Sequence, residues 1–207
     1  FIELYNNTAS AINISGWQFA CTTDGTNNNS AITLPPGALI APGGYFVVAS
    51  KNTGAFASSA NHFDSKVGIT NSSRECRLGN GKTAATVYGI ANFGDVIDTI
   101  GNNTNGFDTA GWNRGVNDGS PNFIRKSMER VNPAASGTAN TNWRNNGYTF
   151  GLNTLVASNF RSNTFASPGA SGTFTETAAA GNVVINEILW MGSYDNGGTG
   201  QTDDEFI

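Results

Sequence analysis

The chain has 207 residues, a net charge of −4 at pH 7, and only 13% charged side chains. This acidic balance argues against a nucleic-acid partner, which would require a basic surface, and no apolar run reaches the roughly 18 residues that indicate a membrane span. Asn, Gly, Thr and Ser make up about 45% of the chain and favour turns and surface strands, while 11% aromatic residues suffice for a packed core.

Short apolar runs separated by Gly, Asn and Pro predict an all-β protein, and their spacing suits a sandwich or a barrel rather than alternating βαβ units. In chain order, the predicted strands are residues 1–5, 12–20, 45–50, 66–70, 75–79, 83–89, 95–101, 124–131 and 183–191. Residues 34–48 are predicted to form a proline-stiffened turn between two strands, with the bend at Gly43 and Gly44. We expect the ring of Trp17 to pack in the core beneath the strand at residues 45–50.

Two long stretches interrupt this pattern. Residues 101–122 carry no periodicity and are predicted as a long irregular excursion. Residues 151–181 end in small and polar residues that are typical of a linker, after which the apolar pattern restarts. This change of composition predicts a domain boundary near residues 172–182, and the segment beyond it is too short to form a core alone.

The sequence contains no catalytic constellation, so we expect no enzyme and assign no catalytic residue. The one histidine, His62, stands in a polar stretch and is predicted to be a solvated loop residue. A zinc site, a serine nucleophile elbow and a phosphate loop would each need motifs that this chain lacks. Asp95 and Asp98 are three residues apart on a predicted strand, so their carboxylates should point to opposite faces.

The two cysteines, Cys21 and Cys76, admit two interpretations. They form one disulfide in an oxidising compartment, or they are two buried free thiols. A disulfide at this spacing would close a loop of about 55 residues and stabilise the chain by roughly 4 kcal/mol in the chain-entropy model.

The acidic stretch 194–205 is the best candidate for a ligand site. It combines hard oxygen donors with glycines that let the backbone fold around an ion, as calcium requires. The candidate calcium ligands are Asp195, Asn196, Asp203 and Asp204. Their spacing matches no common calcium loop, so a solvated hairpin loop is the alternative, and no other cofactor is expected.

The order of the motifs becomes informative when residues 183–207 are placed ahead of residues 1–172. The series then reads VVINEILW (183–190), an acidic gap, DDEF (203–206) running into IELYNN (2–7), INISGWQF (12–19), SMER (127–130) and NWR (142–144). This series resembles the bacterial lamin tail domain, an immunoglobulin-like β-sandwich of secreted and cell-surface proteins. The resemblance covers nearly the whole chain, and it implies an extracellular or cell-surface location in a bacterium.

The resemblance also implies a circular shift, because the family's first strand follows the rest of the domain here. We therefore divide the chain into a sandwich without its first strand (1–172), a linker (173–182), and a segment that completes the same or the next domain (183–207). Copies of the chain joined head to tail would supply the missing strand. The predicted assembly residues are Val183, Val184, Ile185, Ile188, Leu189, Trp190, Phe206, Ile207, Phe1, Ile2 and Leu4.

Three carboxylates, those of Glu3, Glu187 and Glu205, fall in strands that the resemblance places near the edge of the sheet. We expect each of them to accept hydrogen bonds from the backbone of a turn. They are therefore assigned no chemistry.

The leading hypothesis is a non-enzymatic structural module of an extracellular filament, surface layer or repeat adhesin. Its copies would be joined covalently in a tandem array, or by strand exchange in a contact that does not close and so grows a fibre. The alternative is a ligand- or carbohydrate-binding accessory domain of a secreted enzyme, with the regions of Trp112 and Trp143 as its surface, although core packing also explains Trp143. A deliberately permuted chain is a third interpretation. No basic and apolar leader stands at Phe1, so we expect a mature chain or a piece of a longer one.

Overall fold

The computed structural model describes residues 1–52, 59–70, 72–104, 107, 116–117, 125–145, 164–165, 169 and 183–188. Within these residues the chain is all-β, with a single short 3₁₀ turn and no α-helix. The strands of the first half are β1 (Ile2–Asn6), β2 (Ile12–Asn13), β3 (Gln18–Thr22), β4 (Asn28–Thr33), β5 (Leu39–Ile40), β6 (Tyr45–Ala49), β7 (His62–Phe63), β8 (Glu75–Gly79) and β9 (Val96–Gly101). They are followed by β10 (Val116–Asn117), β11 (Arg125–Lys126), β12 (Met128–Arg130), the 3₁₀ turn η1 (Asn140–Asn142), β13 (Trp143–Asn145), β14 (Thr164–Phe165) and β15 (Val183–Ile188).

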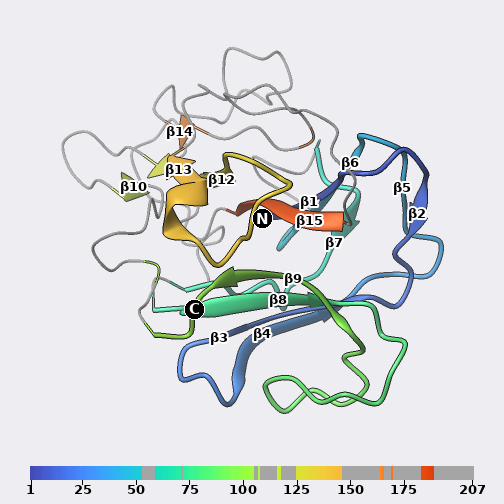
Figure 1. Ribbon diagram of the computed structural model, residues 1–207, viewed down its shortest axis with the longest axis horizontal. Coiled ribbons are helices and arrows are strands. Elements are labelled where there is room, and N and C mark those ends of the chain that lie inside the picture. The colour runs from blue at the N-terminus through green and yellow to red at the C-terminus, as the bar shows by residue number, and fades with distance from the viewer. Residues whose placement is uncertain are drawn as a thin grey trace.

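Two main sheets lie face to face and form a sandwich (Figure 1). One sheet has six strands in the order β13-β12-β15-β1-β6-β7, and the other has four in the order β4-β3-β8-β9. Every neighbouring pair is antiparallel except β6 and β7, which are parallel. Strands β2 and β5 form a smaller two-stranded sheet, and β10, β11 and β14 form a three-stranded one in which β11 and β14 are parallel.

The core fills the space between the two main sheets, because alternate residues of each strand point inward. The six-stranded sheet contributes Ile2, Leu4, Phe46, Val48, Met128, Trp143, Val183, Ile185 and Ile188, and the four-stranded sheet contributes Phe19, Cys21, Ile32, Cys76, Leu78 and Ile100. Trp17 belongs to the same cluster and is only 7% exposed, so the prediction that it is a core residue is confirmed.

Several predicted strands differ from the observed ones. The run 12–20 divides into β2 and β3, because Gly16 adopts a left-handed φ of 75° and the N–H of Trp17 bonds back to the carbonyl of Ile14 in a turn. Residues 83–89 form no strand, since they fold over the outer face of β3 with Val87 bridging to Ile90. The predicted strand 124–131 is interrupted between β11 and β12.

The edge of the four-stranded sheet at β4 is covered by residues 66–70, which were predicted as a strand. At this edge, side-chain hydrogen bonds take the place of backbone pairing between strands. The hydroxyl of Ser30 on β4 donates to the carbonyl of Lys66 and accepts from the N–H of Gly68, both at 2.9 Å. Asn29 donates to the carbonyl of Gly68 at 2.9 Å. Side-chain contacts of this kind leave the edge unavailable to another strand.

The packing of Trp17 generates a direct test. Replacing Trp17 by Ala should lower the free energy of unfolding by about 3–5 kcal/mol, because a buried aromatic ring is lost and a cavity remains. Denaturant titration measures this change. The matched control is Leu39→Ala at a side chain that is 58% exposed, where we expect a change of less than about 0.5 kcal/mol. Equal losses in the two variants would contradict the core position of Trp17.

The loop between β3 and β4 generates a second test, in its pH dependence. The carboxylate of Asp24 accepts the backbone N–H groups of Asn27 at 2.8 Å and Thr26 at 2.7 Å, and these bonds hold its pKa well below the ordinary range. A lowered pKa stabilises the fold above the unfolded-state value, near 4 for an aspartate, and this contribution is lost as the pH falls further.

We therefore expect the thermal stability of the wild-type chain to fall below about pH 4 more steeply than that of the Asp24→Asn variant. Melting curves recorded at intervals from neutral to acid pH check this. Parallel curves for the two proteins would show that these hydrogen bonds contribute nothing to folding.

Candidate functional site

The most distinctive site in the molecule is the slot that β15 occupies between β1 and β12. β15 pairs antiparallel with β1 from Val183 to Ile188, and with β12 at Glu187 and Ile188. All six of its residues are buried. Without β15 the large sheet would be cut into two parts, and the inner side chains of β1 would lose their neighbours.

The backbone of β15 is held by two charged side chains at the point where β12 no longer accompanies it. Asp98 on β9 accepts the N–H of Ile185 at 2.9 Å, and Arg130 donates to the carbonyl of Ile185 at 3.2 Å. Asp98 and Arg130 are themselves paired through two bonds of 2.5 and 3.2 Å, and their side chains are 10% and 2% exposed. This buried ion pair therefore joins the two sheets and closes the ladder of β15.

A short loop packs around the same ion pair. The guanidinium of Arg130 also donates to the carbonyl of Ala135 at 2.6 Å and lies 5.6 Å from the ring centre of Trp143. The indole N–H of Trp143 in turn donates to the carbonyl of Gly137 at 2.9 Å. A Cβ atom at Gly137 would lie 2.2 Å from the carbonyl oxygen of Thr99, so only glycine fits there.

β15 carries a β-bulge at Asn186. Glu3 lies opposite Glu187 whereas Leu4 lies opposite Ile185, so Asn186 is the extra residue. Its side-chain amide donates to Glu3 at 2.9 Å on the outer face of the sheet. The bulge places Ile185 and Ile188 in the core although they are three positions apart.

Three buried carboxylates stand side by side across this outer face. Glu3, Glu187 and Glu129 are direct cross-strand neighbours on β1, β15 and β12, and each is fully buried. Glu187 accepts a short hydrogen bond from the hydroxyl of Ser127, and Glu129 accepts one from Arg144 at 2.5 Å. Their oxygens thus turn to separate partners, and within the described residues no three such side chains are arranged to hold a metal ion.

The prediction that Glu3 and Glu187 lie in strands near the edge of the sheet is wrong, while the prediction of a hydrogen bond from turn backbone holds for Glu3. β1 and β15 are the two central strands of the large sheet, not strands near its edge. Glu3 does accept a backbone N–H from a turn residue, Gly169, but its other partner is the side chain of Asn186. Glu205 lies outside the described residues.

The structure brings most of the predicted assembly residues together in the slot. Phe1, Ile2, Leu4, Val183, Val184, Ile185 and Ile188 are all buried, at 0–6% exposure. In this single chain they complete the chain's own sheet. Leu189, Trp190, Phe206 and Ile207 lie outside the described residues, as do the candidate calcium ligands Asp195, Asn196, Asp203 and Asp204.

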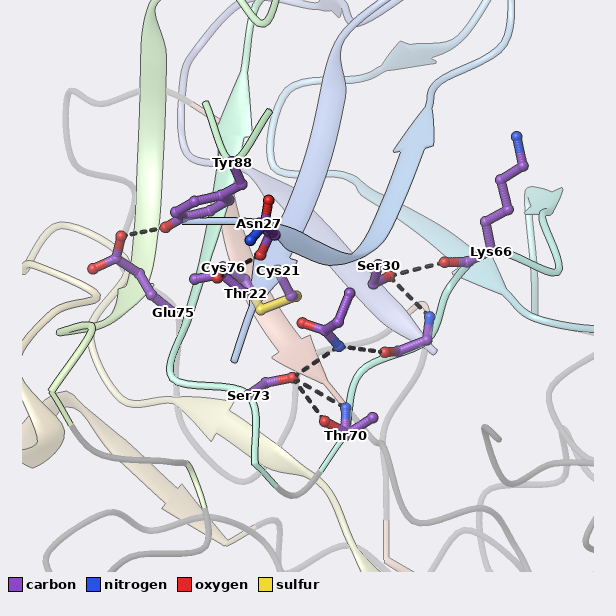
Figure 2. Close-up of a disulfide and its surroundings, with 12 residues drawn as sticks. Cys21, Thr22, Asn27, Ser30, Lys66, Thr70, Ser73, Glu75, Cys76 and Tyr88 are labelled. Atoms are coloured by element: carbon purple, nitrogen blue, oxygen red, sulfur yellow. Dashed lines mark hydrogen bonds between the residues drawn. A yellow bond between two sulfur atoms is a disulfide. The ribbon is translucent and has the colours of Figure 1, made fainter. Parts of the chain in front are cut away.

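Cys21 and Cys76 form a disulfide (Figure 2). The two residues are cross-strand partners on β3 and β8, with their Cα atoms 4.0 Å apart, and both are fully buried. The interpretation as two free thiols is therefore wrong, since the antiparallel register places the two Cβ atoms directly opposite each other.

A polar cluster lies close to the disulfide on the other face of β8 (Figure 2). The phenol of Tyr88 donates a short hydrogen bond to Glu75, and Arg77 pairs with Glu75 at 2.7 Å while lying 5.2 Å from the ring centre of Tyr88. Burial of the phenol, followed by its bond to Glu75, raises the pKa of Tyr88 far above its usual range. The group therefore stays neutral and serves as a structural donor.

The remaining residues considered as candidates for chemistry, Asp95, Asp98 and His62, do not form a common site. Asp95 accepts a hydrogen bond from Asn80 at 3.0 Å whereas Asp98 binds Arg130, so the two aspartates do not meet, as predicted. His62 is not a loop residue. It lies in β7, pairs with Val48 of β6, and is half-buried.

Neither Trp143 nor the depression beside β4 supports a ligand-binding surface. Trp143 is fully buried, so its proposed role in a binding surface is wrong, and Trp112 lies outside the described residues. A shallow depression of about 180 Å³ is smaller than the roughly 300–1,000 Å³ of most ligand pockets. It is lined by Gln18, Ala31, Ile32, Thr33, Asp64, Lys66 and Ile90.

Two packed, mainly antiparallel sheets with a shared core define an all-β, immunoglobulin-like β-sandwich. The model of the Lamin Tail Domain family matches residues 1–113, more than half of the chain, and the chain therefore belongs to this family. It is a family of structural immunoglobulin-like domains, not of enzymes. The matched stretch ends before β12, β13 and β15. No curated protein and no solved structure matches the chain, and no helix in its described part is long and apolar enough to cross a membrane.

The ion pair at Ile185 generates a test of stability. Replacing Arg130 by Met leaves the buried carboxylate of Asp98 without its cation, and we expect the free energy of unfolding to fall by about 3–5 kcal/mol. The matched control is Lys82→Met, because Lys82 is an exposed cation, and the loss there should be less than about 0.5 kcal/mol. Denaturant titration of both variants compares them, and similar losses would contradict the special position of Arg130.

Proposed function

We propose that this chain is a non-enzymatic structural module of a bacterial extracellular filament, surface layer or repeat adhesin, and that its copies are joined head to tail through the β15 slot. The observation that carries the proposal is the position of β15. It is a central, fully buried strand of the large sheet, yet the stretch 146–182 separates it in sequence from the last strand before it in the sheet, β13.

The slot accepts a strand whatever chain supplies it. The contacts of β15 are backbone pairs with β1 and β12 and the two bonds at Ile185, and the same contacts form when the strand comes from a neighbouring copy. A contact of this kind joins one face of a module to a different face of the next. It therefore does not close on itself and extends into a filament.

Association through the edges of the four-stranded sheet is less favourable. Residues 66–70 cover the edge at β4 through Ser30 and Asn29. At the other edge, the N–H of Gly101 on β9 bonds to the carbonyl of Gly137. Since the edge at β4 is covered and the edge at β9 is bonded at Gly101, the slot of β15 is the favoured route for a second copy.

The disulfide supports an extracellular location. Structural disulfides form and persist in oxidising compartments, and Cys21–Cys76 lies in the core, where it contributes to packing as well as to cross-linking. The low charge of the chain, 13% of residues, suits a module packed against copies of itself.

Two measurements test the proposal. The intact mass of native material distinguishes separate subunits of 21.6 kDa from a longer covalent array. For separate subunits, light scattering behind size-exclusion chromatography should show species that grow with protein concentration. A synthetic peptide of residues 183–207 should shorten these species, because it fills the slot of one copy and brings no further domain.

The control peptide has the same composition in scrambled order, and it should leave the size distribution unchanged. Native material of 21.6 kDa that stays monomeric at every concentration, with or without the peptide, would overturn the proposal.

A further inference from the structure

We propose that the slot is selective for the side chains of the strand it accepts, and that its partner is a second copy's strand with three apolar residues followed by Asn, Glu and a further apolar residue, as in Val183–Ile188. This inference rests on the proposed exchange of β15 between copies. The residues that select the strand are Glu3, Ser127 and the ion pair of Asp98 with Arg130.

The apolar positions alone do not define the strand. Val183, Ile185 and Ile188 point into the core, so the spacing is two residues and then three. A regular strand has a spacing of two throughout and would turn Ile188 to the outer face. The slot therefore requires an extra residue between the second and third apolar positions.

Glu3 selects the extra residue. Its carboxylate accepts the side-chain amide of Asn186, which is 1% exposed, and also the N–H of Gly169. A carboxylate can only accept hydrogen bonds, so position 186 must supply a donor. A glutamate at that position would place two buried carboxylates against each other, which is unfavourable for both.

Ser127 selects the next residue. Its hydroxyl donates to the carboxylate of Glu187, which is fully buried between Glu3 and Glu129 in the cross-strand row. The bulge turns both Asn186 and Glu187 toward the outer face, so the order Asn then Glu matches the order of the two partners. Exchanging the two residues keeps the composition and the charge, but it replaces the amide that donates to Glu3 by a carboxylate that cannot donate.

The backbone of the strand is recognised one residue before Asn186. Asp98 accepts the N–H of Ile185, and Arg130 donates to the carbonyl of Ile185. This fixes which residue stands at the end of β12, so a strand displaced by one position loses its side-chain partners. Backbone and side-chain contacts together thus specify one register.

The experiment uses the full chain. It is unfolded in denaturant with its disulfide intact and refolded with a large excess of a fluorescent peptide that competes with its own β15. The native peptide covers residues 181–190, GNVVINEILW, and the matched control exchanges Asn and Glu, GNVVIENILW. A second control is the strand peptide DVIDTIG of residues 95–101, which also has two isoleucines three positions apart but no Asn-Glu pair.

Retention of the native peptide with the folded chain, at least roughly tenfold above both controls, supports the inference, since a mismatched buried group weakens binding by about that factor. Equal retention of the native and exchanged peptides overturns the reading of Asn and Glu while leaving strand exchange intact. Retention of no peptide overturns the exchange. In that case the double variant N186E/E187N of the full chain tests the reading separately: a lower melting temperature supports it, and an unchanged one overturns it.

Discussion

The sandwich depends on how the backbone of Ile185 is satisfied where β12 stops accompanying β15. A buried N–H or carbonyl without a partner costs roughly 1–3 kcal/mol, so the end of a short strand beside a long one is a weak point. Here the carboxylate of Asp98 and the guanidinium of Arg130 take the place of the missing strand. Because Asp98 belongs to the opposite sheet, the same two residues also hold the sheets together.

Only arginine suits this position. Its planar group donates to both oxygens of Asp98 and to two carbonyls at once, and its face lies over Trp143. A lysine presents a single nitrogen and could not reach these partners together. The Glu129-Arg130 pair and the later Trp143, which the family resemblance singles out, are thus parts of one structure: Glu129 faces the outer layer, while Arg130 and Trp143 face the core.

The fold class, the family and the core position of Trp17 could be predicted from the sequence, because each depends on local composition or on motif order. Strand ends could not, since they depend on single backbone conformations such as that of Gly16. β4 escaped prediction because its first three residues are Asn28, Asn29 and Ser30, whose side chains bond to neighbouring loop residues. The partner of Asp98 stands 32 residues away on another sheet, and only the topology brings the two together.

The disulfide sets a limit on how far such a module can be stretched. Cys21 and Cys76 are 55 residues apart, and they join neighbouring strands of the sheet opposite the β15 slot. If tension in the proposed filament pulls β15 away from β1, the segment between the cysteines stays closed while the remainder unravels. That segment would otherwise add about 180 Å of extended chain, so the cross-link shortens the extensible length of each module and keeps β3, β4 and β8 tethered to one another for refolding.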